Sequence, residues 1–185
     1  MKIIFAQGNP GSEFRDTRHN VGFRVLDNFA GAHVAEFAEK TKFHAYIAEL
    51  SEAGEKILLV KPTTYYNDTG VSARAIIDFY KLDPVTDLLV LHDDMALPLG
   101  TVRTREKGSD AGNNGVKSLN SHLGTDYKRV RIGIWNELAD RMDATTFVLG
   151  KFTSEEQKIL SDRQPTITTI IESFIHDTFE TTSYK

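Results

Sequence analysis

The sequence predicts a single three-layer α/β domain, in which helices flank a mixed, mostly parallel and twisted sheet. Short apolar runs alternate along the chain with segments of helical spacing, which is typical of this class. The run Asp87–Leu91 is apolar after its first residue, as in a central strand buried on both faces. A chain of 185 residues, 40% hydrophobic and 26% charged, is long enough to bury one well-formed core. We therefore expect residues 1–185 to form one domain.

The first half of the chain opens with a strand at Lys2–Gln7, a short apolar run bounded by turn formers. A polar loop follows, and a helix then begins near Val21, because the apolar residues there have helical spacing. Two strands are predicted at Phe43–Leu50 and Lys56–Lys61, on either side of the turn formers Glu52–Glu55.

The second half continues the alternation. The polar and aromatic loop 61–70 leads into a helix that ends before Pro84. Five residues at helical spacing are predicted to form its apolar face: Val71, Ala75, Ile76, Phe79 and Tyr80. The remaining predicted elements are strands at Thr101–Glu106 and Arg129–Trp135 and helices at Asn114–Leu123 and Ser154–Phe174, the last with a break or kink at Pro165.

Composition excludes several classes of protein. The chain has no cysteine, so it has neither disulfides nor a thiol nucleophile. No apolar run approaches the ~20 residues of a membrane helix, and the start does not resemble a signal peptide, so we expect a soluble, cytoplasmic protein without a membrane partner. The net charge of −4 argues mildly against a nucleic-acid partner, although a local basic patch would matter more than the total.

Polar residues that could take part in catalysis or binding follow several predicted strands. The loop from Asn9 to His19 follows the first predicted strand. Asn67 follows the predicted strand Lys56–Lys61, and Asp93 follows the central strand Asp87–Leu91. The carboxyl ends of parallel strands meet at one edge of a sheet, so these side chains can converge there, with Asn113 and Asn114 joining them.

The chemistry open to such a group is limited. There is no Gly-x-Ser-x-Gly elbow and no cysteine, so the nucleophile for hydrolysis would be water. His19 can take a proton from that water while a carboxylate fixes its tautomer. Asparagine amides can bind a substrate backbone or a developing oxyanion.

Each of these residues also has a purely structural interpretation. Gly8–Gly11 can be a tight turn, Asn67 a helix cap, and Tyr65 and Tyr66 core residues. His19 with His92, Asp93 and Asp94 could bind a divalent metal, but no His-x-x-x-His or Glu-x-x-His spacing supports that. The residues taken singly leave these alternatives open.

The order of seven motifs along the chain is more specific than any one of them. They are Gly-Asn-Pro-Gly, Thr-Arg-His-Asn-x-Gly, Pro-Thr-Thr-Tyr-Tyr-Asn-x-x-Gly, His-Asp-Asp with a later Leu-Pro-x-Gly, Gly-Asn-Asn-Gly-x-Lys-Ser, Arg-x-Arg-Ile-Gly-Ile and Phe-Val-Leu-Gly-Lys-Phe. From about Lys2 to Phe152 this series closely resembles the bacterial peptidyl-tRNA hydrolase family.

The resemblance implies a monomeric enzyme, with neither metal nor other cofactor, that cleaves the ester between a peptide and the 3′ end of tRNA in peptidyl-tRNA. It implies that His19 is the general base for water, that Asp93 orients it, and that Asn9 recognises the peptide. Substrate-binding roles are implied for four further residues, the amides Asn67 and Asn114 and the aromatic side chains Phe14 and Tyr65. The segment 154–185 is then a C-terminal helical segment of the catalytic domain that covers the cleft.

A basic stripe is the predicted contact with the tRNA body. Arg103, Arg105 and Lys107 alternate along one predicted strand and so project from the same face. Such charges are often only a solvated face, but with the resemblance they indicate a phosphate-binding patch.

The sequence departs from the family pattern at two places that bear on the site. Asn113 replaces the histidine of the usual Gly-His-Asn-Gly, and Tyr65-Tyr66 stands where Phe-Met is common. The competing interpretation is a non-catalytic RNA-binding module of the same fold, similar to splicing factors. The complete set Asn9, His19, Asn67, Asp93 and Asn114 favours the enzyme.

Overall fold

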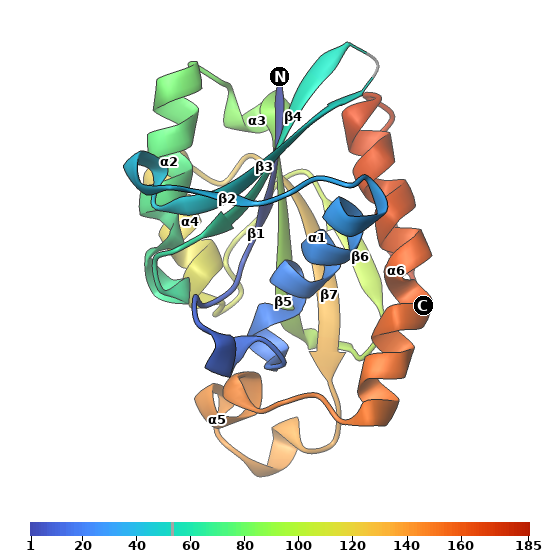
Figure 1. Ribbon diagram of the computed structural model, residues 1–185. Helices are drawn as coiled ribbons and strands as arrows, with labels where there is room; N and C mark the ends of the chain where they lie inside the picture. The colour runs from blue at the N-terminus through green and yellow to red at the C-terminus, as the bar shows by residue number, and fades with distance from the viewer. Residues whose placement is uncertain (53) are drawn as a thin grey trace.

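A mixed sheet forms the middle layer of the molecule, with helices on both of its faces (Figure 1). The computed structural model describes residues 1–52 and 54–185. Within them the strand order is β2-β3-β4-β1-β5-β7-β6-β8. The four central strands β4, β1, β5 and β7 are parallel, and the strands outside them pair antiparallel. The predicted α/β class and mixed sheet are confirmed, with parallel pairing confined to the centre.

The strands follow the predicted order with small changes at their ends. Their bounds are β1 Lys2–Ala6, β2 Ala38–Lys40, β3 Ala45–Glu52, β4 Glu55–Pro62, β5 Leu88–Pro98, β6 Val102–Arg105, β7 Lys128–Trp135 and β8 Ser183–Tyr184. Every residue of β1 is buried, as expected of a strand between two others with helices on both faces. The turn predicted at Glu52–Glu55 includes residue 53 and so lies outside the described residues.

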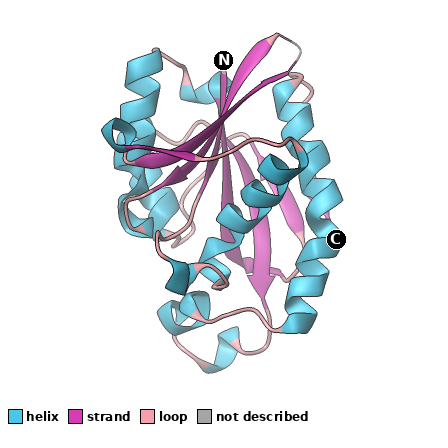
Figure 2. Ribbon diagram, in the orientation of Figure 1, coloured by secondary structure: helices cyan, strands magenta, loops and turns pink. Residues whose placement is uncertain are grey.

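The helices form two layers, and each layer has its own apolar core (Figure 2). Their bounds are α1 Val21–Ala32, α2 Thr69–Tyr80, α3 Pro84–Asp87, α4 Asn114–Leu123, α5 Ala144–Leu149 and α6 Ser154–Ile175. Five short 3₁₀ turns within the described residues are η1 Ser12–Phe14, η2 Arg18–Asn20, η3 Thr41–Phe43, η4 Tyr66–Asp68 and η5 Ala139–Arg141. Helices α1 and α6 cover one face of the sheet, and α2 and α4 cover the other.

The predicted apolar face of α2 is wrong at two positions. Val71 and Phe79 are exposed, whereas Ser72 and Ile77 are buried. The helix is rotated because it packs closely on α4: the backbone N–H of Gly70 donates to Ser118 Oγ at 3.0 Å. Small residues at this contact outweigh the larger apolar ones in setting which face is buried.

The C-terminal segment contains a long helix that packs against the core. Helix α6 continues through Pro165, so the predicted break is absent. The described residues that line the main cavity all lie before residue 154. The helix packs its apolar side, including Leu160, Ile167 and Ile171, into the core shared with α1.

Close backbone packing places the start of α1 against the sheet. A Cβ at Gly22 would lie 2.6 Å from the carbonyl oxygen of Gln7 and 2.7 Å from that of Leu91. Only glycine allows this approach, which brings η2 and its His19 to the carboxyl ends of β1 and β5. No helix in the described part of the chain combines the length and apolarity needed to cross a bilayer.

Candidate active site

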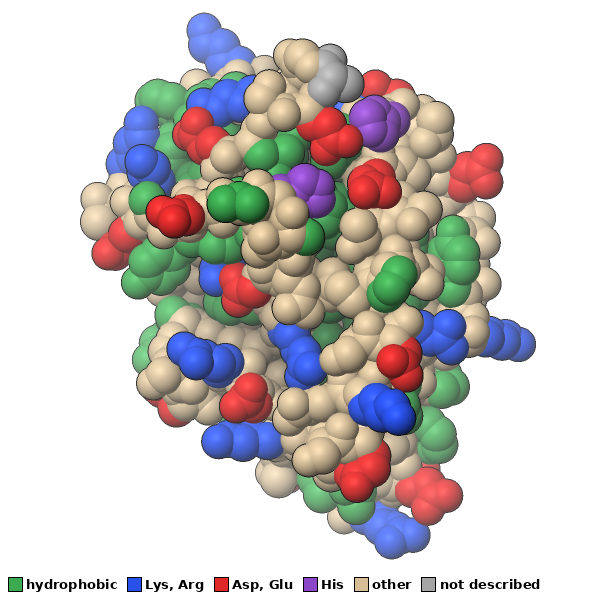
Figure 3. Space-filling model, turned by 45° about the vertical axis from the view of Figure 1, so that its right-hand side comes forward, with side chains coloured by type: hydrophobic (Ala, Val, Ile, Leu, Met, Phe, Trp, Pro, Cys, Tyr) green, Lys and Arg blue, Asp and Glu red, His purple; other side chains and the backbone are tan. Residues whose placement is uncertain are grey.

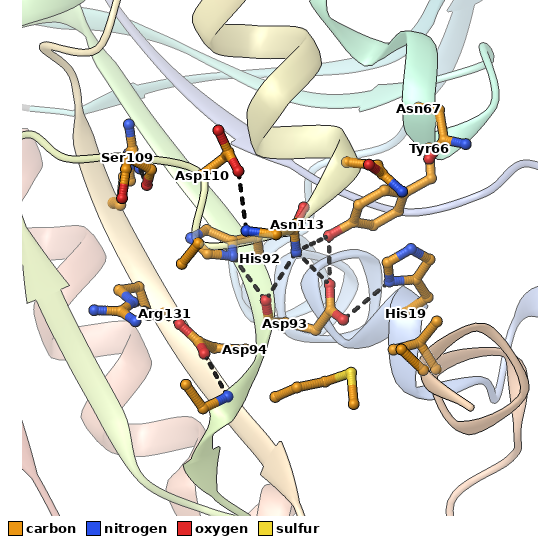
Figure 4. Close-up of a pocket in the computed structure, with 18 of the residues that line it drawn as sticks. His19, Tyr66, Asn67, His92, Asp93, Asp94, Ser109, Asp110, Asn113 and Arg131 are labelled. Carbon is orange, nitrogen blue, oxygen red and sulfur yellow. Dashed lines mark hydrogen bonds and ion pairs between the residues drawn. The ribbon is translucent and has the colours of Figure 1, made fainter. Parts of the chain in front are cut away.

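A cavity of about 610 Å³ opens at the carboxyl ends of the central strands. Its walls come from the loop after β1, the turn η4, the end of β5, the loop before α4 and the helix α5 (Figure 4). Eight of the nine residues predicted for the site line it: Asn9, Phe14, His19, Tyr65, Asn67, Asp93, Arg105 and Asn114. The structure thus places predicted residues from five separate segments around one cavity, and Arg103 is the one predicted residue that is not among those lining it.

His19 and Asp93 form the polar centre of the cavity. His19 Nδ1 lies 2.9 Å from Asp93 Oδ2, and the carboxylate is 2% exposed. A carboxylate accepts hydrogen bonds, so Nδ1 carries the proton and Nε2 is left with a lone pair. That arrangement turns His19 into a proton acceptor with a fixed tautomer.

The Asp93 carboxylate is held in its charged form. Burial alone raises its pKa, but the nearby imidazole of His19 and hydrogen bonds from His19 and Tyr66 outweigh burial, so the pKa lies below its ordinary value. Asp93 is therefore an anion throughout the neutral range and can stabilise a positive charge on His19.

Tyr66 and Asn113 complete this centre, and the sequence did not identify Tyr66 as part of it. The Tyr66 ring stacks on the His19 ring with centroids 3.4 Å apart and planes 12° apart. Its hydroxyl donates to Asp93 Oδ1, and Asn113 Nδ2 donates to that hydroxyl oxygen at 3.0 Å. No local pattern distinguishes Tyr66 from a core tyrosine, because its partners lie in β5 and at the start of α4.

Asn9 is fixed by a reciprocal pair of hydrogen bonds. Its backbone N–H donates to Asn20 Oδ1 at 2.8 Å, and Asn20 Nδ2 donates to the Asn9 carbonyl at 2.9 Å. Asn9 Oδ1 accepts from the backbone N–H of Tyr66 at 2.8 Å. This bond assigns the amide orientation and leaves Nδ2 as the donor available for a ligand.

The rim of the cavity carries the other predicted binding residues. Asn67 and Asn114 are exposed and also border a second, adjoining hollow over α4. Tyr65 is 65% exposed, whereas its neighbour Tyr66 is buried, so the two tyrosines have different surroundings. Residues of α5, among them Val148 and Leu149, supply an apolar wall that the sequence did not predict.

The basic residues near the cavity differ in how many hydrogen bonds they make to other groups of the protein. Arg129 binds the carbonyl oxygens of Gly108 and Ser109 and so holds the loop before α4. Arg131 Nε donates to Asp94 Oδ2 at 2.6 Å. Arg105 lines the cavity, and Arg103 lies opposite Arg131 in the register of β6 and β7. Burial and the like charges of Arg103 and Arg131 lower the pKa of Arg105.

A buried ion pair anchors the turn that carries His19. Arg18 Nη2 donates to both carboxylate oxygens of Glu156, at 3.0 and 2.9 Å, and the Arg18 guanidinium lies 4.6 Å from the centre of the Phe147 ring. Glu156 also completes the capping box at the start of α6. The residue before His19 is thus tied to both α5 and α6.

The possible metal ligands have other partners. His92 Nδ1 donates to the Asp93 carbonyl at 2.8 Å, and burial lowers the pKa of His92. Among the residues that the structure describes, no three His, Cys, Asp or Glu side chains are arranged to hold a metal ion.

Comparison with known proteins shows which family the chain resembles in sequence. The family model described as peptidyl-tRNA hydrolase matches residues 3–185. A peptidyl-tRNA hydrolase of Lactiplantibacillus plantarum is 44% identical over 176 residues, which cover 95% of this chain and 93% of the relative. One from Gloeobacter violaceus is 46% identical over 161 residues, which cover 86% of this chain and 80% of that protein.

A solved structure shows the same fold. The crystal structure of peptidyl-tRNA hydrolase from Acinetobacter baumannii matches with a TM-score of 0.88 and 29% identity, over 96% of this chain and 89% of that one. The chain belongs to the peptidyl-tRNA hydrolase family.

Proposed function

We propose that this protein hydrolyses the ester between a peptide and the 3′ end of tRNA and so releases both. The observation that carries the proposal is the His19–Asp93 pair, set in a cavity whose rim is lined with asparagine amides. Membership of the peptidyl-tRNA hydrolase family supports the choice of substrate.

The geometry supports a general-base mechanism. His19 Nε2 takes a proton from a water molecule, and the resulting hydroxide attacks the ester carbonyl carbon. Asp93 stabilises the imidazolium that forms. When the tetrahedral intermediate collapses, the imidazolium returns that proton to the departing 3′ oxygen of the ribose. Because the base is an imidazole held by a carboxylate, we expect activity to be unaffected by EDTA.

The asparagines are suited to holding the peptide end of the substrate. Asn9 presents Nδ2 from a clamped backbone, which suits a carbonyl oxygen of the peptide. Asn67 and Asn114 stand at the rim beside the aromatic side chains of Phe14 and Tyr65. The Asn9 amide is fixed by its hydrogen bonds and binds without further ordering, so it adds to positioning of the ester.

The basic residues are suited to the tRNA backbone. Arg105 and Lys107 line the cavity, and Arg103 lies on the same strand as Arg105. Phosphate contacts position a nucleic acid without reading its sequence, so we expect little dependence on the tRNA sequence. All of these groups come from one chain, which suits a monomer.

The experiment compares wild type with His19→Ala on an N-acetyl-aminoacyl-tRNA, with and without EDTA. General-base catalysis is typically worth about 10²–10⁴-fold, so we expect a loss of that size. His176→Ala is the matched control, because His176 pairs with Glu52 away from the cavity. The control should retain full activity.

The other outcomes separate the competing interpretations. Salt-sensitive tRNA binding by wild type without any cleavage would indicate the non-catalytic RNA-binding module. Cleavage that survives His19→Ala would show that the mechanism is wrong, and cleavage abolished by EDTA would indicate a metal-dependent hydrolase.

A further inference from the structure

We propose that Tyr66, oriented by Asn113, is a positioning residue that fixes both members of the His19–Asp93 pair. The proposal rests on the proposed function of that pair. Tyr66 contacts each member in a different way, through its ring and through its hydroxyl (Figure 4).

The ring of Tyr66 holds the plane of the imidazole. The two rings are stacked, and Tyr66 is 2% exposed, so the contact is enclosed. A Cβ at position 115 would lie 2.3 Å from Tyr66 Cε1, so the Tyr66 ring occupies the space that the missing side chain of Gly115 leaves. The Tyr66 backbone N–H is also bound by Asn9 Oδ1. Neither ring can tilt without disturbing one of these contacts.

The hydroxyl of Tyr66 belongs to a chain of hydrogen bonds whose directions are all determined. The backbone N–H of Val116 donates to Asn113 Oδ1 at 3.0 Å, which turns Nδ2 toward Tyr66. The hydroxyl oxygen accepts from Asn113, so its proton points at Asp93 Oδ1. Asp93 Oδ2 remains for His19. Oδ1 therefore accepts from Tyr66 and, at 3.4 Å, from Asn113, whereas Oδ2 accepts from His19, and this division opposes rotation of the carboxylate away from the imidazole.

Tyr66 stays a donor in this chain throughout the neutral range. Burial, with the charge of Asp93 and the hydrogen bond to it, raises the pKa of Tyr66 well above its ordinary value. Tyr66 and Asn113 are also two positions at which the sequence departs from the common family pattern. Because Asn113 donates directly to the Tyr66 hydroxyl, these two unusual residues act together in the structure.

The test uses Tyr66→Phe, which keeps the ring and removes the hydroxyl. A hydrogen bond to a charged group is lost, so we expect kcat to fall about tenfold or more with KM unchanged. The low-field proton resonance of the His19 Nδ1–H should shift, because Asp93 loses the hydrogen bond from the Tyr66 hydroxyl. If the Tyr66 hydroxyl contributed only to stability, a Tyr66→Phe variant with the wild-type melting temperature would show an unshifted resonance.

Two further variants act as controls. Tyr127→Phe removes the hydroxyl of another buried tyrosine, which donates to Asn120 Oδ1 at 2.7 Å, and should leave kcat and the resonance unchanged. Asn113→Ser keeps a side-chain oxygen for the helix cap but loses the donor to Tyr66. Asn113 Nδ2 also lies 3.4 Å from Asp93 Oδ1 and 3.2 Å from the Asp93 carbonyl oxygen, so in the double variant with Tyr66→Phe its effect on kcat should add only in part.

Specific results would overturn the proposal. The proposal is contradicted if His19→Ala is inactive but Tyr66→Phe has the wild-type kcat and an unshifted resonance. It is also contradicted if Tyr66→Phe changes KM alone. An active His19→Ala variant instead contradicts the proposed function itself. If Tyr66→Phe does not fold, Asn113→Ser alone carries the same two measurements.

Discussion

At the scale of single residues, burial decides which polar groups take part in the site. Tyr65 and Tyr66 are adjacent and chemically identical, but one is exposed on the rim and the other is enclosed against His19 and Asp93. The sequence identified His19, Asp93 and Asn9 through motifs. It could not identify Tyr66, because what distinguishes this residue is contact with segments far away in the chain.

The buried tyrosines should make stability depend on alkaline pH. Burial is the main cause that raises the pKa of Tyr66 well above its ordinary value and that of Tyr127 to about 12. A tyrosine in the unfolded chain ionises near about pH 10. The stabilisation is therefore fully present below that pH and is lost as the pH rises toward the folded-state pKa. The urea midpoint should fall above about pH 10, and less steeply in Tyr66→Phe. Equal slopes in the two proteins would contradict this assignment.

At the scale of elements, the pattern of apolar residues predicted the central strands and most of the longer helices. It failed where packing depends on small residues: α2 is rotated by its contact with α4 through Gly70. It also missed β2, whose residues Ala38–Lys40 are all exposed and carry no apolar pattern. Helix α5 was missed because six residues are too few for a period to be recognised.

Helix α1 offers a matched pair of glycines that tests how His19 is placed. Gly22→Ala would put a methyl group against two backbone carbonyl oxygens, so the helix must move, at a cost of about 1–3 kcal/mol in unfolding free energy. Gly31→Ala meets no atom within 4 Å and should be neutral or stabilise by about 0.5 kcal/mol. Thermal melts and kcat should show loss of both stability and activity only at position 22. Full activity in Gly22→Ala would show that the position of His19 does not depend on this contact.

At the scale of the whole molecule, the net charge is −4, but a group of basic residues lies beside the cavity. Acidic and basic side chains are interspersed on the face shown in Figure 3. Beside the cavity, by contrast, Arg103, Arg105 and Arg131 are close enough to influence one another. Sequence alternation predicted Arg103 and Arg105, together with Lys107, but not that Arg103 would lie outside the lining of the cavity.

The salt dependence of tRNA binding tests whether this local group matters. Arg105→Gln and Lys56→Gln both change the net charge from −4 to −5, but Lys56 pairs with Glu49 away from the cavity. If Arg105 binds a phosphate, its loss should reduce the slope of log K against log salt by about 0.7–0.9. The Lys56 variant should keep the wild-type slope. The same slope in all three proteins would show that Arg105 makes no phosphate contact.

The central position of β1 also governs when the site can exist during folding. Ile3 lies between Leu58 and Leu88, so both pairings of β1 join it to residues far along the chain. Such non-local pairing is slow, whereas the β3–β4 hairpin is local and can form early. His19 follows β1 and Asp93 lies on β5, so the two meet only when these strands are paired. We therefore expect a partly folded chain in which β1 is not yet paired with β5 to lack the assembled His19–Asp93 pair.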